Sequence, residues 1–450
     1  MTKILPTIGP VSESIHNLKK IMKFSDTLRL NAAHNSISWH ANIVKKIKKL
    51  NNNSKILIDL PGIKPRTKNN HQINIKKNEN VIFFYKSNIR IKNLRHFKQV
   101  ELSKPIPKIK KKSFFSISDG RHKFKMIKYA KNYIIGRSNN TFSLLPQKGL
   151  NIPGSIYSEN LQIRVYEKVL KKLKNIKFDA IGLSFVQSAS IIKKIKAKYP
   201  KKILVSKIEN SLGCKNLDEI IQYSDIIMID RGDLSAEIGE ENLFNMVENI
   251  SVKSKLFGKP LIIATENLES MIQGFSPTKS EIMSIAYSKK NFVDQIMLSD
   301  ETATSKNFYK TLTWLNGFLK SKKNIENKKS RDGLNLLWSV VKNLNSEKNK
   351  LVVFTKKGFA IEKITSMSPN IEMNIFTDNI ELSKLLSFKS NTVCKLTKKF
   401  PINMNKFIYY QIKKNKKIIF GNKNIFLIYI SFPRSKSRAN TISFITENDF

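Results

Sequence analysis

Four charged residues at the ends of apolar segments have the chemistry to act on a phosphate group. Glu209 and Asp233 supply two acids, and Arg29 and Lys207 supply two fixed cations. Paired carboxylates without a His or Cys partner suit a hard ion such as Mg²⁺, which bridges to substrate phosphate. Cations beside such an ion suit phosphoryl transfer, which depends on positioning and charge neutralisation. An exposed ion pair would explain Lys207 and Glu209 alone, but not a convergent set.

The elements that must position these residues are eight apolar runs of strand length before residue 305, separated mostly by amphipathic stretches with helical spacing. Apolar runs without alternation, divided by helices, are typical of parallel strands that are buried on both faces. Eight of them predict an α/β fold with a closed (β/α)₈ TIM barrel. The runs are Ile4–Gly9, Thr27–Asn31, Ile56–Leu60, Ala180–Phe185, Ile203–Glu209, Ile226–Asp233, Pro260–Glu266 and Gln295–Glu301.

Each run ends in polar residues with chemical capacity. Barrel active sites are built at the carboxyl ends of the strands, so we expect these residues to surround one site. Turn formers such as Asn, Gly and Ser would suffice if the residues merely ended strands, whereas this set is rich in charged side chains. They are Thr7, Arg29, Asn31, Asp59, Ser184, Lys207, Glu209, Arg231, Asp233, Thr265, Glu266, Ser299 and Glu301.

The barrel pattern is interrupted once and then ends. Short alternating stretches such as Val81–Tyr85 and Asn132–Gly136 predict a small β domain at residues 66–153, inserted into a barrel formed by residues 1–65 and 154–325. The charged stretch Lys320–Lys329 is interpreted as a linker. Strands at Leu351–Phe354 and Ile425–Ile430 then predict a C-terminal α/β domain at residues 330–450.

Composition narrows the class of protein. The chain of 450 residues has a formal charge of +47, which raises the hypothesis of a nucleic-acid-binding protein. The Lys excess is spread over every segment and forms no localised patch interleaved with aromatic residues, so we expect no specific nucleic-acid partner. Cys214 and Cys394 form no CxxC pair. With no long apolar segment and no signal sequence, we expect a cytoplasmic protein that does not bind a membrane.

Several motifs resemble, in content and order, those of the pyruvate kinase family. The resemblance covers residue 2 to about residue 305 and is thin afterwards. The motifs are TKILPTIGPVSES from Thr2, RLNAAH at Arg29–His34, KGLNIPG at Lys148–Gly154, SKIEN at Ser206–Asn210, RGDL at Arg231–Leu234, ATENLESM at Ala264–Met271, PTKSE at Pro277–Glu281 and IMLSDETA at Ile296–Ala303.

The resemblance implies transfer of the phosphoryl group of phosphoenolpyruvate to ADP, giving pyruvate and ATP as the last step of glycolysis. It also implies that the inserted domain is a small β-barrel lid and that the protein is a homotetramer. Glu209 and Asp233 would hold Mg²⁺ or Mn²⁺. Lys207 would neutralise the transferring phosphoryl group, which Arg29 would also bind.

The remaining implied roles concern the substrate carboxylate, the proton and the nucleotide. Backbone N–H groups of Gly232 and Asp233, with the Thr265 hydroxyl, would bind the carboxylate. Protonation of the enolate would use Thr265, Ser299 and Glu301. Nucleotide contacts would come from Arg66, Lys148, Asn31 and His34, although a packing or hydrogen-bonding role for His34 is the alternative.

The sequence departs from the family pattern at the monovalent cation site. Ala33 replaces a K⁺-ligand hydroxyl, and Lys64 stands where the family commonly has Glu. A fixed ammonium at that place would supply the charge that K⁺ otherwise brings. We therefore predict activity without K⁺, with Asn31, Asp59 and Lys64 as the remnant of the site.

Other departures keep an alternative function open. Pro61, Gln187, Glu266, Asn267 and Asp300 replace residues that are common in the family. A paralogue with an altered substrate, or a regulatory binding protein with weak or no catalysis, is therefore the second hypothesis. In the C-terminal domain, TKKGFA at Thr355–Ala360 and PRSKSRANT at Pro433–Thr441 have lost donors for a sugar phosphate, so we expect no fructose-bisphosphate control.

Overall fold

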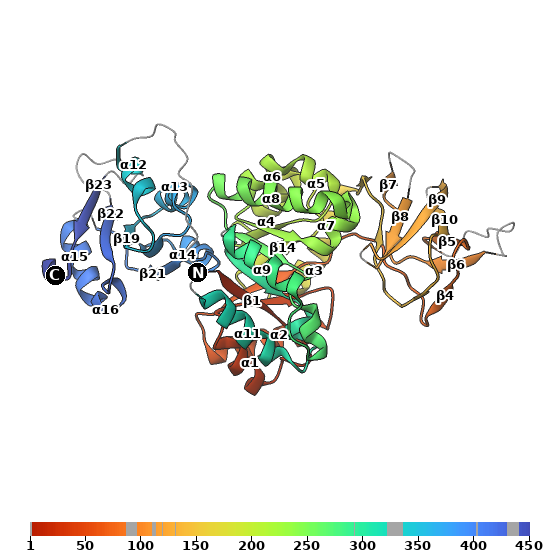
Figure 1. Ribbon diagram of the computed structural model, residues 1–450, viewed down its shortest axis with the longest axis horizontal. Coiled ribbons are helices and arrows are strands. Elements are labelled where there is room, and N and C mark those ends of the chain that lie inside the picture. The colour runs from red at the N-terminus through yellow and green to blue at the C-terminus, as the bar shows by residue number, and fades with distance from the viewer. Residues whose placement is uncertain are drawn as a thin grey trace.

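The structure is a computed structural model that describes residues 2–86, 97–109, 114–118, 120–130, 132–291, 293–321, 336–401, 404–429 and 441–450. Three units lie in a row (Figure 1): a central α/β barrel, a unit of strands on one side and an α/β unit on the other. Within the described residues, none of the helices has the length and apolar character needed to cross a membrane.

A closed barrel of eight parallel strands forms the centre of the molecule. The strands follow the order β1-β18-β17-β16-β15-β14-β3-β2, and β1 closes the ring by pairing with both β18 and β2. The predicted TIM barrel is therefore confirmed. Its strands are β1 (Lys3–Ile8), β2 (Thr27–Asn31), β3 (Lys55–Asp59), β14 (Ala180–Leu183), β15 (Ile203–Ile208), β16 (Ile226–Asp230), β17 (Leu261–Ala264) and β18 (Gln295–Leu298).

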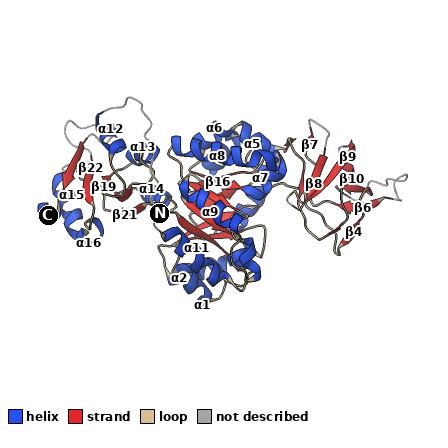
Figure 2. Cartoon of the chain, in the orientation of Figure 1, coloured by secondary structure: helices blue, strands red, loops and turns tan. Residues whose placement is uncertain are grey.

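Helices surround the barrel strands (Figure 2). Serine side chains at Ser14, Ser36 and Ser158 accept the N–H bonds that start three of them. Thr278 and Glu281 form a capping box at the start of another. The helices are α1 (Ile15–Met22), α2 (Ile37–Leu50), α3 (Glu159–Lys172), α4 (Ala189–Lys198), α5 (Ser211–Lys215), α6 (Leu217–Tyr223), α7 (Arg231–Ile238), α8 (Glu240–Leu256), η2 (Glu269–Gln273), α9 (Lys279–Lys290), α10 (Asp300–Ala303) and α11 (Phe308–Lys320).

The barrel strands are buried on both faces, which is why they appear in the sequence as continuous apolar runs. Alternate residues such as Leu5 and Met228 belong to an inner cluster, to which Phe388 of the C-terminal unit also contributes. Their neighbours, such as Ile4 and Ile227, pack in a second cluster with the surrounding helices. Packing on both faces holds each strand in place, and the residues at the strand ends are held with it.

Most of the barrel strands end one or two residues before the predicted runs, and two of them end three residues before. The sixth run was expected to reach Asp233, but the strand ends at Asp230 because Arg231 begins α7. The eighth run was expected to reach Glu301, but the strand ends at Leu298, before α10. Asp233 and Glu301 therefore lie in the first turns of helices, where the helix dipole favours acidic side chains.

Residues between β3 and α3 form a separate unit of strands, here called the β unit. It contains a six-stranded sheet, β12-β8-β9-β10-β5-β6, and two pairs, β11-β4 and β13-β7. At its core Phe115 and Phe124 stack, and Phe83 packs edge to face against both. The strands are β4 (Ile73–Ile75), β5 (Asn80–Phe84), β6 (Lys98–Glu101), β7 (Lys108–Ile109), β8 (Phe114–Ile117), β9 (His122–Ala130), β10 (Tyr133–Ser138), β11 (Phe142–Leu144), β12 (Leu150–Asn151) and β13 (Ser155–Ile156).

The C-terminal unit has a five-stranded sheet in the order β21-β20-β19-β22-β23, with β23 antiparallel to its neighbour. Most of the expected linker Lys320–Lys329, the strand end Ile430 and nearly all of Pro433–Thr441 lie outside the described residues. The domain bounds given above remain predictions. The elements are α12 (Leu336–Asn343), β19 (Asn349–Phe354), α13 (Phe359–Met367), β20 (Glu372–Thr377), α14 (Ile380–Ser387), β21 (Thr392–Leu396), α15 (Met404–Lys414), α16 (Lys416–Ile419), β22 (Asn424–Tyr429), β23 (Thr441–Ile445) and η3 (Glu447–Asp449).

Candidate functional site

A cavity of about 760 Å³ lies at the carboxyl ends of the barrel strands. Of the residues expected at the site, Lys148 and Arg231 are not part of its lining: the partly buried Lys148 belongs to the β unit, and Arg231 begins α7. The other predicted residues all line this cavity: Arg29, Asn31, His34, Asp59, Lys64, Arg66, Lys207, Glu209, Gly232, Asp233, Thr265, Ser299 and Glu301.

Lys207, at the end of β15, is surrounded by carboxylates. Its Nζ lies 3.4 Å from Asp59 Oδ2, 3.3 Å from Glu209 Oε2 and 3.2 Å from Asp230 Oδ2, and the residue is buried. Burial disfavours the charged ammonium, but the three acids outweigh it and raise the pKa of Lys207 well above its ordinary value. Lys207 therefore stays a cation throughout the physiological pH range.

Arg29 on β2 is held by its neighbours on β1 and β3. Its Nε and Nη2 donate to Asp59 Oδ2 at 3.0 and 2.7 Å, and Nη1 donates to Thr7 Oγ1 at 2.8 Å. Burial acts to raise the pKa of Asp59, but the charges of Lys207 and Arg29 prevail and hold that pKa below its ordinary value. The pair gives the cavity wall a second fixed cation.

Three acidic side chains lie close enough together to share one cation. One carboxylate oxygen from each of Glu209, Asp230 and Asp233 lies within 4.8 Å of the other two. Glu209 and Asp233 are predicted from the sequence, whereas Asp230 is not, because it resembles an ordinary member of the sixth run. The sequence does contain a signal that could have identified Asp230. It is the one acidic residue in the apolar segment that starts at Ile226 and ends before Arg231.

These donors fit a divalent ion such as Mg²⁺ or Mn²⁺, because such ions prefer carboxylate oxygens. Glu209 is completely buried; its Oε1 accepts the Phe185 N–H at 2.6 Å, but its Oε2 accepts no hydrogen bond. Burial raises the pKa of Glu209 well above its ordinary value, and Asp230 adds to the shift although Lys207 opposes it. A bound cation would satisfy this oxygen.

The residues predicted for the monovalent site have three different sets of partners. The Lys64 ammonium contacts Asp233 Oδ1. This contact overcomes the opposing effect of burial and lowers the pKa of Asp233. Asp59 accepts from Arg29, while Asn31 Oδ1 accepts the Ala33 N–H at 3.0 Å. Lys64 therefore places its charge beside the acidic cluster.

The turn after β17 has unusual backbone conformations that Arg231 stabilises. Thr265 and Glu266 have φ angles of 61° and 51°, a region that residues other than glycine rarely adopt, and β-branched residues such as Thr265 least of all. Arg231 Nη2 donates to the carbonyl oxygens of Thr265 and Glu266 at 2.6 and 2.7 Å. Thr265 Oγ1 in turn accepts the Gly232 N–H at 3.0 Å and donates to Asp230 Oδ1 at 3.1 Å. Arg231, which the sequence placed at a strand end, thus stabilises the turn that carries Thr265.

Glu301 is held against the backbone after β18. Its Oε2 accepts the Ser299 N–H at 2.6 Å and its Oε1 accepts the Leu268 N–H at 3.4 Å. Burial nevertheless raises the pKa of Glu301, since it exceeds the effect of these bonds. Glu301 can therefore keep a proton at a higher pH than an exposed glutamate.

The residues predicted to meet the nucleotide lie at the rim of the cavity or beyond it. Arg66 is exposed and its Nη1 donates to the Gln147 carbonyl at 3.1 Å. The Lys148 N–H donates to Thr67 Oγ1 at 3.1 Å within the β unit. The carbonyl of His34 accepts from His40 Nε2 at 2.9 Å.

Two departures from the family pattern have packing roles. The buried Gln187 exchanges two hydrogen bonds with the backbone of Tyr157, at 3.1 and 3.2 Å. Asn267 accepts from Arg231 at 2.8 Å and donates to the Met297 carbonyl at 2.8 Å. The other departures, Pro61, Glu266 and Asp300, line the cavity itself.

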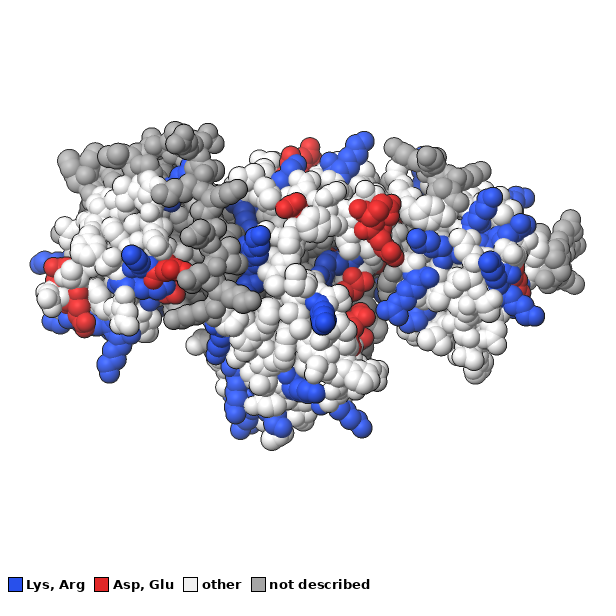
Figure 3. Space-filling view, viewed as in Figure 1, with Lys and Arg blue, Asp and Glu red and all other residues white. Residues whose placement is uncertain are grey.

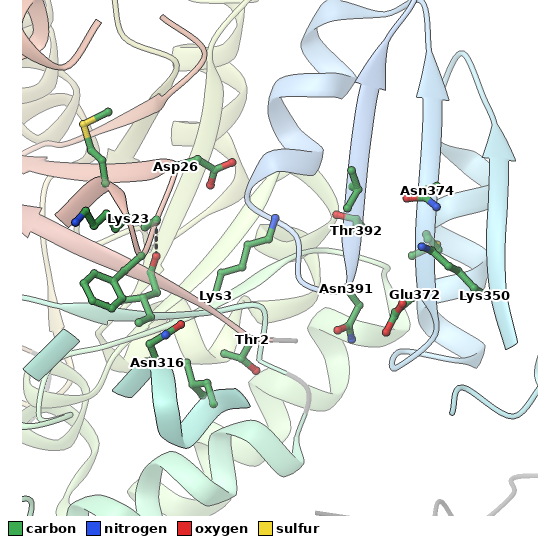
Figure 4. Close-up of a pocket in the computed structure, with 17 residues that line it drawn as sticks. Thr2, Lys3, Lys23, Asp26, Asn316, Lys350, Glu372, Asn374, Asn391 and Thr392 are labelled. Carbon is green, nitrogen blue, oxygen red and sulfur yellow. Dashed lines mark hydrogen bonds between the residues drawn. The ribbon is translucent and has the colours of Figure 1, made fainter. Parts of the chain in front are cut away.

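Charged side chains differ in their distribution over the surface. On the face in Figure 3, Lys and Arg are distributed over all three units, whereas several Asp and Glu side chains gather where the barrel meets the β unit. A second cavity of about 520 Å³ lies between the barrel and the C-terminal unit (Figure 4), and none of the predicted site residues lines it. Its charged lining residues are Lys3, Lys23, Asp26, Lys350 and Glu372.

Comparisons with known proteins give a consistent result. The family profile described as "Pyruvate kinase, barrel domain" matches residues 1–311. The pyruvate kinase of Thermococcus litoralis is 32% identical over 318 residues, which cover 68% of this chain and 66% of that protein, just under two thirds. The pyruvate kinase of Methanocaldococcus jannaschii is 29% identical over 465 positions and covers 98% of this chain and 97% of its own. The crystal structure of pyruvate kinase from Pyrobaculum aerophilum shares the fold, with a TM-score of 0.76 over 99% of both chains at 21% identity.

Proposed function

The chain belongs to the pyruvate kinase family, and from this premise we propose that it transfers the phosphoryl group of phosphoenolpyruvate to ADP, producing pyruvate and ATP. One observation carries the proposal: two buried cations, Arg29 and Lys207, and an acidic cluster line one cavity at the carboxyl end of the barrel. The reaction would be the last step of glycolysis, in the cytoplasm. A homotetramer is the proposed assembly.

Lys207 and Arg29 are proposed to bind the transferring phosphoryl group. Phosphoryl transfer spreads negative charge over the equatorial oxygens, and fixed cations in a site that excludes water stabilise that charge. Both side chains are buried and held by carboxylates, so little reorganisation is needed when the charge develops. Glu209 and Asp233 would hold Mg²⁺ or Mn²⁺, which when bound supplies further charge neutralisation.

The substrate carboxylate is proposed to bind at the start of α7. The Gly232 N–H now donates to Thr265 Oγ1 at 3.0 Å, so it would exchange this partner for the substrate, as would the Asp233 N–H. Thr265, Ser299 and Glu301 are the groups proposed to deliver the proton to the enolate. The raised pKa of Glu301 suits it to keep a proton in this network.

The nucleotide is proposed to bind between the barrel rim and the β unit. Arg66, Asn31 and His34 line the cavity, whereas Lys148 does not. A phosphate contact by Lys148 would therefore need the β unit to close toward the barrel. Charges fixed on the two units would then meet the nucleotide from opposite sides.

Pyruvate formation tests the proposal. The purified protein is given phosphoenolpyruvate, ADP and Mg²⁺, and pyruvate is measured through NADH oxidation by lactate dehydrogenase. We expect turnover that requires all three additions.

A regulatory binding protein is the second candidate, because Asp230, Glu266 and Asp300 add negative charge to a cavity that must accept anions. Binding of phosphoenolpyruvate without pyruvate formation would favour it.

A further inference from the structure

We propose that Asp230 acts as a third acidic ligand, which lets this site bind a divalent ion tightly before any phosphorylated substrate arrives. The inference rests on the proposed function, because it concerns the same cation site. It goes beyond the two ligands, Glu209 and Asp233, that the sequence analysis assigned.

The position of Asp230 supports a role inside the site. It is the last residue of β16 and only 7% exposed, and it lines the cavity. Its carboxylate lies within 4.8 Å of those of Glu209 and Asp233. An octahedral ion with Mg–O distances of about 2.1 Å holds ligand oxygens about 3 Å apart when they are adjacent and about 4 Å apart when they are opposite. The three carboxylates are therefore close to the spacing that one ion requires.

The balance of charge provides an independent reason. The contacts at the cavity floor leave the acids in excess, since four carboxylates pair with three cations. Without Asp230 the numbers of negative and positive side chains in this set would be equal. These residues are Asp59, Glu209, Asp230 and Asp233 with Arg29, Lys64 and Lys207.

The excess of negative charge affects Glu209. Lys207 is shared among three carboxylates at 3.2 to 3.4 Å, so it is no dedicated partner of any one. Glu209 Oε2, completely buried, accepts no hydrogen bond. A buried carboxylate oxygen in this state is costly unless a cation or donor satisfies it. A divalent ion at the cluster would remove this cost, and Asp230 adds to its attraction.

Binding order follows from the same charges. An anionic substrate that enters the site without the ion meets the added carboxylate of Asp230 and is repelled. We therefore expect the ion to bind first and the affinity for phosphoenolpyruvate to depend strongly on it.

Mn²⁺ alone tests the inference. Free Mn²⁺ is measured by electron paramagnetic resonance during titration of the full-length protein, without substrate. Asp230→Asn should weaken Mn²⁺ binding at least about tenfold. In Asp230→Ala, which leaves no side-chain oxygen at this position, water-proton relaxation of the bound Mn²⁺ should also show about one additional water ligand, which a loss of charge alone would not produce.

Matched variants make the outcomes decisive. Asp300→Asn removes the same charge from the exposed rim and should change affinity less than about twofold. Asp230→Ala serves as a second variant if Asp230→Asn does not fold. Unchanged Mn²⁺ affinity in Asp230→Asn, with affinity lost in Glu209→Gln, would overturn the inference alone. Absence of Mn²⁺ binding by the unaltered protein would overturn both the inference and the proposed metal site.

Discussion

Replacing Lys207 by methionine should damage both catalysis and stability. The substitution keeps the length of the side chain but removes the cation 3.2 to 3.4 Å from Asp59, Glu209 and Asp230. At an effective dielectric constant of about 20, one such contact corresponds to about 5 kcal/mol of Coulomb energy before desolvation. Leaving buried carboxylates without their partner has a net cost of about 3–5 kcal/mol. The loss of transition-state stabilisation should lower the rate by at least about 10²-fold.

The pH dependence of this cost has a definite sign. Because the pKa of Lys207 is raised in the folded protein, its stabilisation is fully present below the unfolded-state pKa of about 10.4. It is lost only as the pH rises through the higher folded-state value. In Lys207→Met the neighbouring carboxylates lose the cation that opposes a rise in their pKa, so the difference in stability between this variant and the unaltered protein should grow as the pH rises above the ordinary pKa of a glutamate.

Two assays measure these effects. Pyruvate formation gives the rate, and thermal unfolding gives the stability. Lys207→Arg, which keeps the charge, should retain more stability than Lys207→Met. Adding Asp230→Asn to Lys207→Met should restore part of the stability, because one unpaired carboxylate is removed. The reasoning is refuted if Lys207→Met keeps its full rate or unfolds at the same temperature as the unaltered protein.

Three further predictions follow from other parts of the site. Burial raises the pKa of Glu237 to about 8, so the folded state holds a proton that the unfolded state releases near pH 4.5, and stability should fall between these values as pH rises. The stability of Glu237→Gln relative to the unaltered protein should therefore increase from pH 5 to pH 8, by up to about 5 kcal/mol in the free energy of unfolding, and thermal unfolding measures this increase. A difference in stability that is independent of pH would contradict this prediction. Because Lys64 carries a fixed charge beside the acidic cluster, rates in potassium-free and potassium-containing buffers should be comparable, and a large stimulation by K⁺ would show this interpretation to be wrong. A methyl group added at Gly182 would lie 2.9 Å from Asp59 Oδ1 and 3.1 Å from its Cα, so Gly182→Ala should lower stability by about 1–3 kcal/mol and reduce the rate; normal unfolding and activity would argue against so close a contact.

The sequence could predict that the candidate residues gather at one cavity because one rule governs their positions. Carboxyl ends of parallel barrel strands meet at one rim, so residues as distant as Arg29, Lys207 and Glu301 could be assigned to one cavity. Their side-chain partners could not be predicted in this way. Lys64 was expected beside Asp59, yet it contacts Asp233.

Residues near strand ends were harder to interpret. Apolar runs do not show where a strand gives way to a helix, since both bury apolar side chains. Asp230 was therefore missed as a site residue, and Arg231, one position later, supports the turn at Thr265. Lys148 was assigned to the nucleotide site, but its distance from the cavity depends on how the β unit sits on the barrel, which local sequence patterns do not encode.

The proposal that the chain moves a phosphoryl group between two substrates is tested most directly by phosphorus nuclear magnetic resonance. The protein is incubated with phosphoenolpyruvate, ADP and Mg²⁺, and the phosphorus signals are followed with time. Loss of the phosphoenolpyruvate signal should be matched by growth of the γ-phosphate signal of ATP. An unchanged spectrum, or conversion of phosphoenolpyruvate to inorganic phosphate without ATP, would contradict the proposed transfer.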